Sequence, residues 1–320
     1  MKILLIGINF FGYDKKIKES LELLGYQVEL CYDMPKRYVL PMVFLSEKKI
    51  KKINIKYQKK IIKKIEKNDY DKGIVIVGRY LTREFFEKIS YYRISKNLIL
   101  YLWDDVLRVK NFFEVKNYYK EIFSFDSKDC VKYNFKFLPL FYSDDYFSSP
   151  ANKTLDVFTA FTMHSDRINI INKICIFLAG RKNYFFVKVG KLNFIKLLFK
   201  KNNSSIHFSI RALASKQNSE LIRKSKCVLD IQHPSQNGLT IRSIEVLQSQ
   251  TKLITTNENI KDYDFYNEQN ILVIDRQNPY IPNDFIDSPF DDSIIPLLAK
   301  YSVLEWVKVL LGETFYQYRI

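Results

Sequence analysis

The sequence predicts an α/β protein built from two Rossmann-like domains in succession. Short apolar runs alternate with amphipathic segments along the whole chain, which is typical of parallel sheets covered by helices. A polar stretch at 143–154 interrupts this alternation, and the same pattern starts again after it. The 320 residues also suit two domains of ordinary size. We therefore expect a first domain at 1–147 and a second at 148–320.

The first domain is expected to open with a strand at 2–7, a helix at 14–25 and a strand at 27–32. Its first loop lacks the G-x-G-x-x-G pattern, so a dinucleotide site is not expected there. Further strands are predicted at 73–77, 98–102, 122–125 and 135–138. Ligands of such sheets gather beyond the carboxyl ends of the strands. The polar residues at these ends are Asn9, Arg79, Asp104, Asp105 and Asp126.

Residues 48–67 carry ten lysines, and Ile50, Ile53, Tyr57, Ile61 and Ile65 recur at helical spacing. One interpretation is a helix with a solvated basic face. The other is a helix whose basic face lies against anionic lipid. A nucleic-acid arm is disfavoured because the isoleucines form a packing stripe rather than a stacking platform, although the net charge of +16 favours phosphate-bearing partners in general.

The second domain is predicted to contain strands at 155–161, 184–189 and 206–210. Its most informative stretch, 227–256, indicates a strand, a loop, a helix capped by Thr240 and a further strand. The free N–H groups at such a helix start suit a phosphate, and Arg242 lies in the first turn. Glu245 lies about one turn further, where a carboxylate can accept hydrogen bonds from ribose hydroxyls.

Within this stretch, Gly238-Leu239…Glu245-Val246-Leu247 and Lys252-Leu253-Ile254-Thr255-Thr256 resemble the donor-sugar motif of bacterial glycosyltransferases of the GT-B architecture. The spacing from glycine to glutamate is longer here, and Gln248-Ser249-Gln250 replaces the usual small-residue turn. The segment 257–276 resembles a subgroup of these enzymes that is found in capsule and O-antigen gene clusters. The resemblance implies two Rossmann-like domains, with a final helix, here about 294–311 with a break at Pro296, crossing back to the first.

The resemblance also implies a nucleotide-sugar donor held on the second domain. The start of the Thr240 helix, with Arg242 or Arg167 as the cation, would neutralise the diphosphate without metal. Arg167 could instead be a surface residue paired with Asp166 or Glu220. His233-Pro234 resembles a pair with which some sialyltransferases of this architecture hold the phosphate of a CMP-linked donor, but Val106 follows Asp104-Asp105 where their second signature has glycine. His164 lies in the first loop of this half, and Gly238 and Thr240 shape the second loop.

The general base is expected in the first domain. Trp103-Asp104-Asp105 follows a strand, and either Asp104 or Asp105 could take the acceptor's proton or cap the next helix. Asp69-Tyr70-Asp71 and Asp262-Tyr263-Asp264 match the letters of an Asp-x-Asp metal motif, but they fall in a turn and a loop. We therefore expect no metal and no cofactor beyond the nucleotide-sugar substrate.

The expected function is sugar transfer from a nucleotide-sugar to a surface glycan of the capsule, O-antigen or lipopolysaccharide type, with a lipid-linked acceptor. The first strand at the N-terminus is too short for a signal peptide, and no run of about 18 apolar residues predicts a membrane span. Four scattered cysteines fit a reducing cytosol, so a cytoplasmic enzyme at the inner membrane face is expected. Two alternatives stay open: a two-lobed nucleotide- or sugar-binding protein without turnover, and a nucleic-acid-binding protein motivated only by charge.

Overall fold

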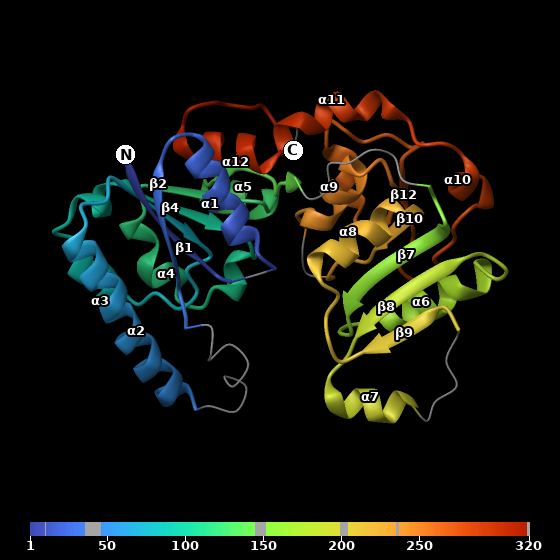
Figure 1. The fold of residues 1–320 in the computed structure, drawn as a ribbon, viewed down its shortest axis with the longest axis horizontal. Helices are drawn as coiled ribbons and strands as arrows, with labels where there is room; N and C mark the ends of the chain where they lie inside the picture. The colour runs from blue at the N-terminus through green and yellow to red at the C-terminus, as the bar shows by residue number, and fades with distance from the viewer. Residues whose placement is uncertain (10, 36–45, 145–151, 199–203, 235–236, 319–320) are drawn as a thin grey trace. The chain divides into compact units, whose positions relative to one another are not determined.

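The computed structural model describes residues 1–9, 11–35, 46–144, 152–198, 204–234 and 237–318. The chain forms two compact units: unit 1 is Met1–Leu140 with Val303–Tyr318, and unit 2 is built from Phe141–Ser302. Each unit holds one six-stranded parallel sheet with helices packed on it (Figure 1). The predicted class, α/β with two Rossmann-like sheets, is confirmed. The predicted boundary between 147 and 148 lies outside the described residues.

The sheet of unit 1 has the strand order β2-β1-β3-β4-β5-β6. Its strands are β1 (Lys2–Gly7), β2 (Gln27–Tyr32), β3 (Lys72–Ile76), β4 (Leu98–Leu102), β5 (Glu121–Ser124) and β6 (Lys136–Phe137). The central strands are aliphatic and buried, as expected where helices cover both faces of a parallel sheet. The chain reverses direction across the sheet between β1 and β3, which is therefore the switch point of this unit.

The third strand begins and ends one residue earlier than predicted. It was expected to run from Gly73 to Val77, but β3 ends at Ile76. Val77 and Gly78 have φ values of 61° and 62°, in the left-handed region, so the backbone turns away from the sheet there. This turn carries Arg79 at the carboxyl edge of the sheet. A β-branched residue with positive φ is strained, and such strain is common near functional sites.

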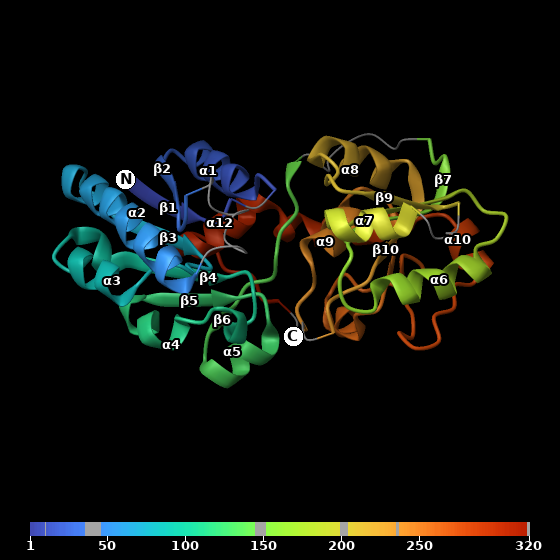
Figure 2. The ribbon, with the colours of Figure 1, turned by 90° about the horizontal axis from the view of Figure 1, so that it is seen from below.

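Unit 1 places its helices in two layers. The helices and 3-10 turns are α1 (Tyr13–Leu23), α2 (Glu47–Lys67), α3 (Arg83–Ile89), η3 (Arg93–Asn97), η4 (Val106–Arg108), α4 (Phe112–Val115), η5 (Lys116–Tyr118), α5 (Ser127–Tyr133) and α12 (Val303–Leu311). The right-handed crossover rule puts α1 on one face and the helices that follow β2 to β5 on the other. In Figure 2, α1 and α12 accordingly lie across the sheet from α3, α4 and α5.

The end of the chain differs from prediction. A helix over about 294–311 with a break at Pro296 was expected, but Pro296 lies in the first turn of α11 (Ile295–Leu298), where proline fits. The break falls instead at Ser302, whose extended backbone (ψ 152°) separates η9 (Ala299–Tyr301) from α12. Trp306 of α12 is buried in unit 1 and packs edge-on against Tyr101 of β4, with ring centroids 4.6 Å apart.

The sheet of unit 2 has the strand order β12-β11-β10-β7-β8-β9. Its strands are β7 (Leu155–Thr162), β8 (Asn183–Lys188), β9 (Ile206–Ser209), β10 (Ser225–Asp230), β11 (Lys252–Thr255) and β12 (Ile271–Val273). The remaining helices and turns are α6 (Arg167–Phe177), α7 (Lys191–Leu198), α8 (Ser215–Arg223), α9 (Ile241–Gln248), η7 (Glu258–Asp262), α10 (Asn283–Asp287) and η8 (Asp292–Ile294). This is the order of a dinucleotide-binding fold, with its switch point between β7 and β10.

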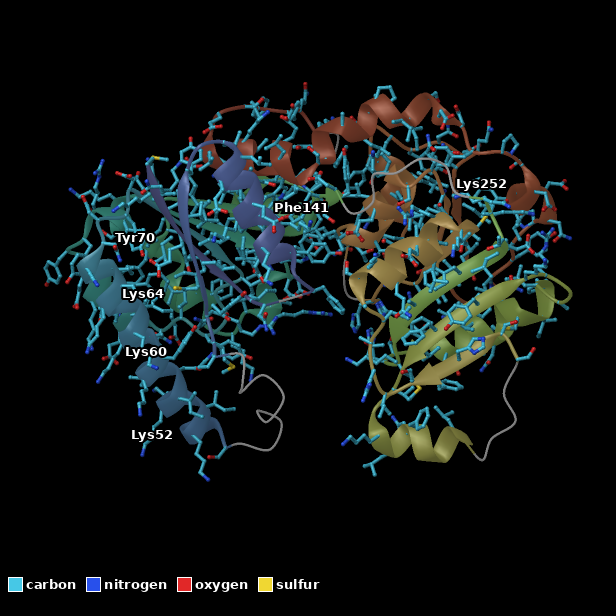
Figure 3. The ribbon with its side chains drawn as sticks, in the orientation of Figure 1. Lys52, Lys60, Lys64, Tyr70, Phe141 and Lys252 are labelled. Carbon is cyan, nitrogen blue, oxygen red and sulfur yellow. The ribbon has the colours of Figure 1, made fainter. Side chains whose placement is uncertain are left out.

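One lysine of unit 2 is part of the core. Lys252 in β11 is 2% exposed, and its Nζ donates to Ser288 Oγ over 2.9 Å at the end of α10 (Figure 3). Burial lowers the pKa of this ammonium group. The lysine therefore anchors α10 to the sheet and is not available to bind a ligand.

Candidate functional site

Unit 2 brings two loops together at the carboxyl edge of its sheet. Strands β7 and β10 are paired neighbours, so the loop after β7, which leads into α6, leaves the sheet beside the loop after β10, which leads into α9. The sequence predicted six site residues in these loops or in the first turns of the helices: His164, Arg167, His233, Gly238, Thr240 and Arg242. They belong to the switch point, where ligands bind in doubly wound sheets.

His164 and Arg167 are in direct contact. Arg167 NH1 lies 2.8 Å from His164 Nε2. Because a guanidinium only donates, Nε2 must accept, which assigns the ring proton to Nδ1, 3.3 Å from Ser165 Oγ. The ring centroid of His233 lies 5.7 Å from that of His164. The structure thus gathers three residues that the sequence singled out from two loops almost 70 residues apart.

Asp230 organises the second loop. This carboxylate ends β10 and is 5% exposed. Thr240 Oγ1 donates to its Oδ2 over 2.6 Å, and Ser243 Oγ donates to the same atom over 3.2 Å. Arg242 NH1 lies 4.0 Å from its Oδ1. Three side chains from the start of α9 are therefore oriented by one buried carboxylate.

The predicted side-chain cap by Thr240 is wrong. Thr240 is the residue that precedes α9, but its hydroxyl bonds Asp230 and makes no cap hydrogen bond. Thr240 therefore supplies no side-chain cap to the first N–H groups of α9. A helix start of this kind can bind an anion, because its N–H groups and its dipole both favour negative charge.

Arg276 is a site residue that the sequence analysis did not identify. It follows β12, and its Nε and NH2 lie 2.8 and 2.6 Å from Asp166 Oδ2 and Oδ1. Its NH1 donates to Gln232 O over 3.2 Å, so it links the loops after β7, β10 and β12. The hydrogen bonds from Arg276 to Asp166 hold the pKa of this carboxyl below its usual value. The signal in the sequence was a charged pair, Asp275-Arg276, directly after an apolar run.

The arginines make this edge electropositive. Burial lowers the pKa of the Arg167 guanidinium, and Arg242 and Arg276 act in the same direction while Asp230 opposes them. The Nε of Arg167 is buried and has no hydrogen-bond partner. Three guanidinium groups therefore stand near two carboxylates, Asp166 and Asp230. An arrangement with an unsatisfied donor and an excess of positive charge can accept an anion.

The remaining predicted donor residues lie beneath the loops. Glu245 in α9 is 2% exposed. Gly238 is also buried, and its carbonyl accepts a hydrogen bond of 3.3 Å from Asn257 Nδ2. Asn237 O accepts a further bond of 2.9 Å from Asn259 Nδ2. The segment that leads to Thr240 is thus fixed by amide side chains from η7 and the residue before it.

In unit 1, the predicted acceptor-side residues form ion pairs. Asp104 Oδ2 lies 2.6 Å from Arg79 NH2, and Asp105 Oδ2 lies 2.9 Å from Arg108 Nε. Asp105 precedes η4 but makes no cap hydrogen bond, so the capping alternative fails for it. Both side chains keep part of their surface exposed, at 24% and 15%. They stand at the carboxyl end of β4, as the sequence predicted.

Two buried carboxylates of unit 1 were not anticipated. Asp33, just beyond β2, is 3% exposed, and its Oδ2 is buried without a hydrogen-bond partner. Burial raises its pKa to about 7, against hydrogen bonds from the Tyr80 and Arg79 backbone and the charge of Arg79. Asp14 of α1 is 2% exposed, accepts from Ile8 N over 3.0 Å and adds to the upward shift of Asp33. Aspartates in strand-end loops are common, so the sequence alone did not distinguish these two.

Helix α2 carries the lysines. Ile61, Ile62 and Ile65 are buried against the sheet, and Lys59, Lys60 and Lys63 are exposed. Lys64 is exposed but bonded to Glu29 of β2. Lys52, Lys60 and Lys64 mark the length of the helix in Figure 3. Ten lysines and two glutamates give α2 a net charge of +8, half that of the chain. No helix within the described ranges is long and apolar enough to cross a membrane.

No family model matches the chain, and no curated protein matches it. Solved structures do. A glycosyltransferase from Rickettsia africae aligns at 12% identity over 98% of this chain and 99% of its own, with a TM-score of 0.61. AviGT4, a glycosyltransferase involved in avilamycin A biosynthesis, aligns at 10% identity over 97% and 98%, with a TM-score of 0.60.

The matching structures include enzymes that catalyse different reactions. A DNA-modifying β-glucosyltransferase that uses uridine diphosphoglucose aligns at 15% identity over 98% of this chain and all of its own, with a TM-score of 0.54. A UDP-N-acetylglucosamine 2-epimerase from Rickettsia bellii aligns at 8% identity over 98% and 96%, also with a TM-score of 0.54. Likeness at such identities establishes the fold alone. The chain has the two-domain fold of the GT-B glycosyltransferases.

Proposed function

We propose that the protein is a glycosyltransferase that moves a sugar from a nucleotide-sugar to a surface glycan. The observation that carries this proposal is the convergence of Arg167, Arg242 and Arg276 at the switch point of unit 2, beside the start of α9. The likeness of 257–276 to capsule and O-antigen enzymes supports the choice of acceptor class.

The donor would bind with its diphosphate at the arginines. In the transfer, an acceptor hydroxyl attacks the anomeric carbon, the bond from that carbon to the diphosphate oxygen breaks, and the nucleoside diphosphate leaves with both bonding electrons. Fixed N–H groups and guanidinium groups stabilise the charge that develops on this leaving group. The arginines supply the positive charge that neutralises the leaving group, so the proposal includes no metal. Glu245 would accept hydrogen bonds from the ribose, as acidic side chains do in related folds.

The acceptor side is assigned to unit 1. If the sugar configuration inverts, a base must take the proton of the acceptor hydroxyl. Asp104 and Asp105 are the residues proposed for it, because both carboxylates are partly exposed at a strand end. Ion pairs with Arg79 and Arg108 hold the two carboxylates in place before the hydroxyl arrives.

The protein would work in the cytoplasm at the inner membrane face, on a lipid-linked glycan. The exposed lysines of α2 support this location, since each basic residue near an anionic surface contributes about 1 kcal/mol to binding. None of the six isoleucines of α2 is exposed, since three are buried and three half-buried, so this contribution would be mainly electrostatic and sensitive to salt.

A thermal-shift screen tests the proposal. UDP, GDP, CMP and their sugars are compared with one oligonucleotide, with and without EDTA. A nucleotide at about 100 times its dissociation constant should add about 2.7 kcal/mol to stability. Donor hydrolysis or transfer to a glycan then separates an enzyme from a nucleotide-binding protein without turnover. No stabilisation by any nucleotide, with tight and steeply salt-dependent oligonucleotide binding, would replace the transferase by a nucleic-acid protein.

A further inference from the structure

Three short segments of unit 1 join into one exposed surface. The 3-10 turn η4 is tied to α5 by a hydrogen bond of 2.8 Å from Val106 N to Asp129 Oδ2. Helix α4 meets the end of α5 through Phe113 and Tyr133, whose ring centroids lie 5.7 Å apart. We call η4, α4 and α5, with the residues between η4 and η5, the short-helix surface.

Each segment presents one large apolar side chain to solvent. Leu107 of η4 is 80% exposed, Phe113 of α4 is 52% exposed and Val131 of α5 is 83% exposed. Single exposed apolar residues are normal and need no explanation. Here three come from three segments in contact, and none of them is needed by the core beneath, which is filled by Val106, Phe112 and Cys130.

Lysines surround these apolar side chains. Lys110, Lys128 and Lys132 are exposed, and Lys116 is half-buried. Lys116 Nζ lies 5.9 Å from the ring centroid of Phe113, and Lys132 Nζ lies 5.0 Å from that of Tyr133. Four carboxylates lie nearby: Asp105 pairs with Arg108, Asp126 is buried, Asp129 accepts the Val106 bond and Glu114 is exposed. Apolar side chains among basic ones are typical of surfaces that sit at the boundary of an anionic bilayer.

We propose that the short-helix surface docks onto an anionic phospholipid bilayer, with Leu107, Phe113 and Val131 inserted among the headgroups and the lysines against phosphate. It differs from α2, whose described exposed side chains are lysines and Glu66 and whose isoleucines are buried or half-buried. Helix α2 would attract the membrane through charge, and the short-helix surface would add an apolar contact that salt does not screen.

The surface adjoins the proposed acceptor residues. Leu107 is two residues from Asp105, and Arg108 of the same turn pairs with Asp105 over 2.9 Å. A bilayer bound here would bring the Asp104-Asp105 loop to the level of a lipid-linked acceptor. This last step rests on the proposed function, but docking itself does not, since vesicle binding is measured without any donor or acceptor.

The experiment is vesicle co-sedimentation of the full chain, with phosphatidylcholine alone or with about one third phosphatidylglycerol, at low salt and at about 0.5 M salt. The test variant is Leu107→Glu with Val131→Glu. The control is Leu23→Glu with Tyr91→Glu, which replaces two side chains of unit 1 that are 76% and 91% exposed and changes the net charge equally. Because all four positions are exposed, circular dichroism and melting should match the wild type.

We expect the test variant to bind anionic vesicles roughly tenfold more weakly than the control, at both salt concentrations. Lys128→Gln with Lys132→Gln should weaken binding at low salt only. Equal binding by test and control variants would overturn the proposal. Loss of self-association in light scattering, with vesicle binding unchanged, would assign the surface to a second copy of the chain instead. Loss of oligonucleotide binding, again with vesicle binding unchanged, would assign it to nucleic acid.

Discussion

Arg276 binds Asp166 through two parallel hydrogen bonds, of 2.8 and 2.6 Å, across 110 residues of sequence. Such a fork fixes both partners in one plane, which a single point charge cannot do. It holds the loop after β7, which carries His164 and leads into Arg167, against the loop after β12. The shape of the proposed diphosphate site therefore depends on a pair that lies beside it.

Arg276→Lys should weaken binding of a nucleoside diphosphate roughly tenfold to a hundredfold, because lysine keeps the charge but loses the fork. Titration calorimetry with the best nucleotide of the screen measures this. Arg181→Lys is the matched control: Arg181 makes a similar fork to Asp287, of 3.0 and 2.7 Å, and the other partners of its guanidinium are Asn283 and Asp156, which are not site residues. If both variants bind equally well, Arg276 has no role in holding the nucleotide.

Arg167→Gln should lose nucleotide affinity without losing stability. Its guanidinium is half-buried near two other arginines, and its Nε has no partner, so the folded protein bears a cost for keeping it. We expect an unchanged or slightly raised melting temperature together with diphosphate binding weakened by about tenfold or more. A variant that melts well below the wild type would show instead that Arg167 is structural.

Glu245→Gln should weaken the binding of uridine, UMP and UDP by a similar factor of about ten, because the proposed contact is to the ribose that all three share. If the screen selects another base, its nucleoside, monophosphate and diphosphate take their place. Arg276→Lys should by contrast weaken binding of the nucleoside diphosphate and leave binding of the nucleoside unchanged. Glutamine is chosen because Glu245 is buried, and a shorter side chain would leave a cavity. If Glu245→Gln weakened binding of the nucleoside diphosphate alone, Glu245 would not contact the ribose.

Asp33→Asn should stabilise unit 1 at pH 8 and have little effect near pH 4. The native pKa of Asp33 is raised from 3.8 to about 7, so the folded state holds a proton that the unfolded state has released between these values. Stability therefore falls as the pH rises from about 4 to 7. An uncharged side chain avoids that loss, which is on the order of 4 kcal/mol.

Tryptophan fluorescence during urea unfolding measures the effect of Asp33→Asn, because both tryptophans, Trp103 and Trp306, lie in unit 1. Asp287 lies in unit 2 and provides a control of opposite sign, followed by circular dichroism because both tryptophans are in unit 1. Hydrogen bonds from Arg181 and Lys226 lower its pKa, so Asp287→Asn should remove stability at pH 7 and have little effect at low pH. A wild-type stability that does not change between pH 5 and 8 would contradict the raised pKa of Asp33.

Neutralising four lysines of α2 should lower binding to anionic vesicles about tenfold or more at low salt and have little effect at high salt. The variant replaces with glutamine Lys56, Lys59, Lys60 and Lys63, and leaves Lys64 because it bonds Glu29. The control removes the same charge from exposed positions of unit 2: Lys182, Lys191, Lys216 and Lys224. Equal loss in both variants would mean that total charge, not this helix, governs binding.

The local pattern of the chain was sufficient to place most strands and the start of α9. Consecutive aliphatic residues bounded by glycine, proline or polar residues predict buried strands, and β4 and β11 have the predicted bounds. Arg167 and Arg242 were chosen as candidates in the same way, because each lies in the first turn of a helix that follows a strand and its loop. The prediction that Thr240 caps α9 was wrong because its hydroxyl donates to Asp230, which lies ten residues earlier in the sequence.

The sequence by itself determined the two parallel sheets and which loops stand at their carboxyl edges, because strand pattern and crossover handedness are local properties. Only the tertiary structure decided that Arg276 reaches Asp166, that Asp33 and Glu245 are buried, and that the last helix breaks at Ser302. Ion pairing and burial depend on which segments meet in space, and the energy of a charged group is set by those neighbours rather than by the residues beside it in the chain.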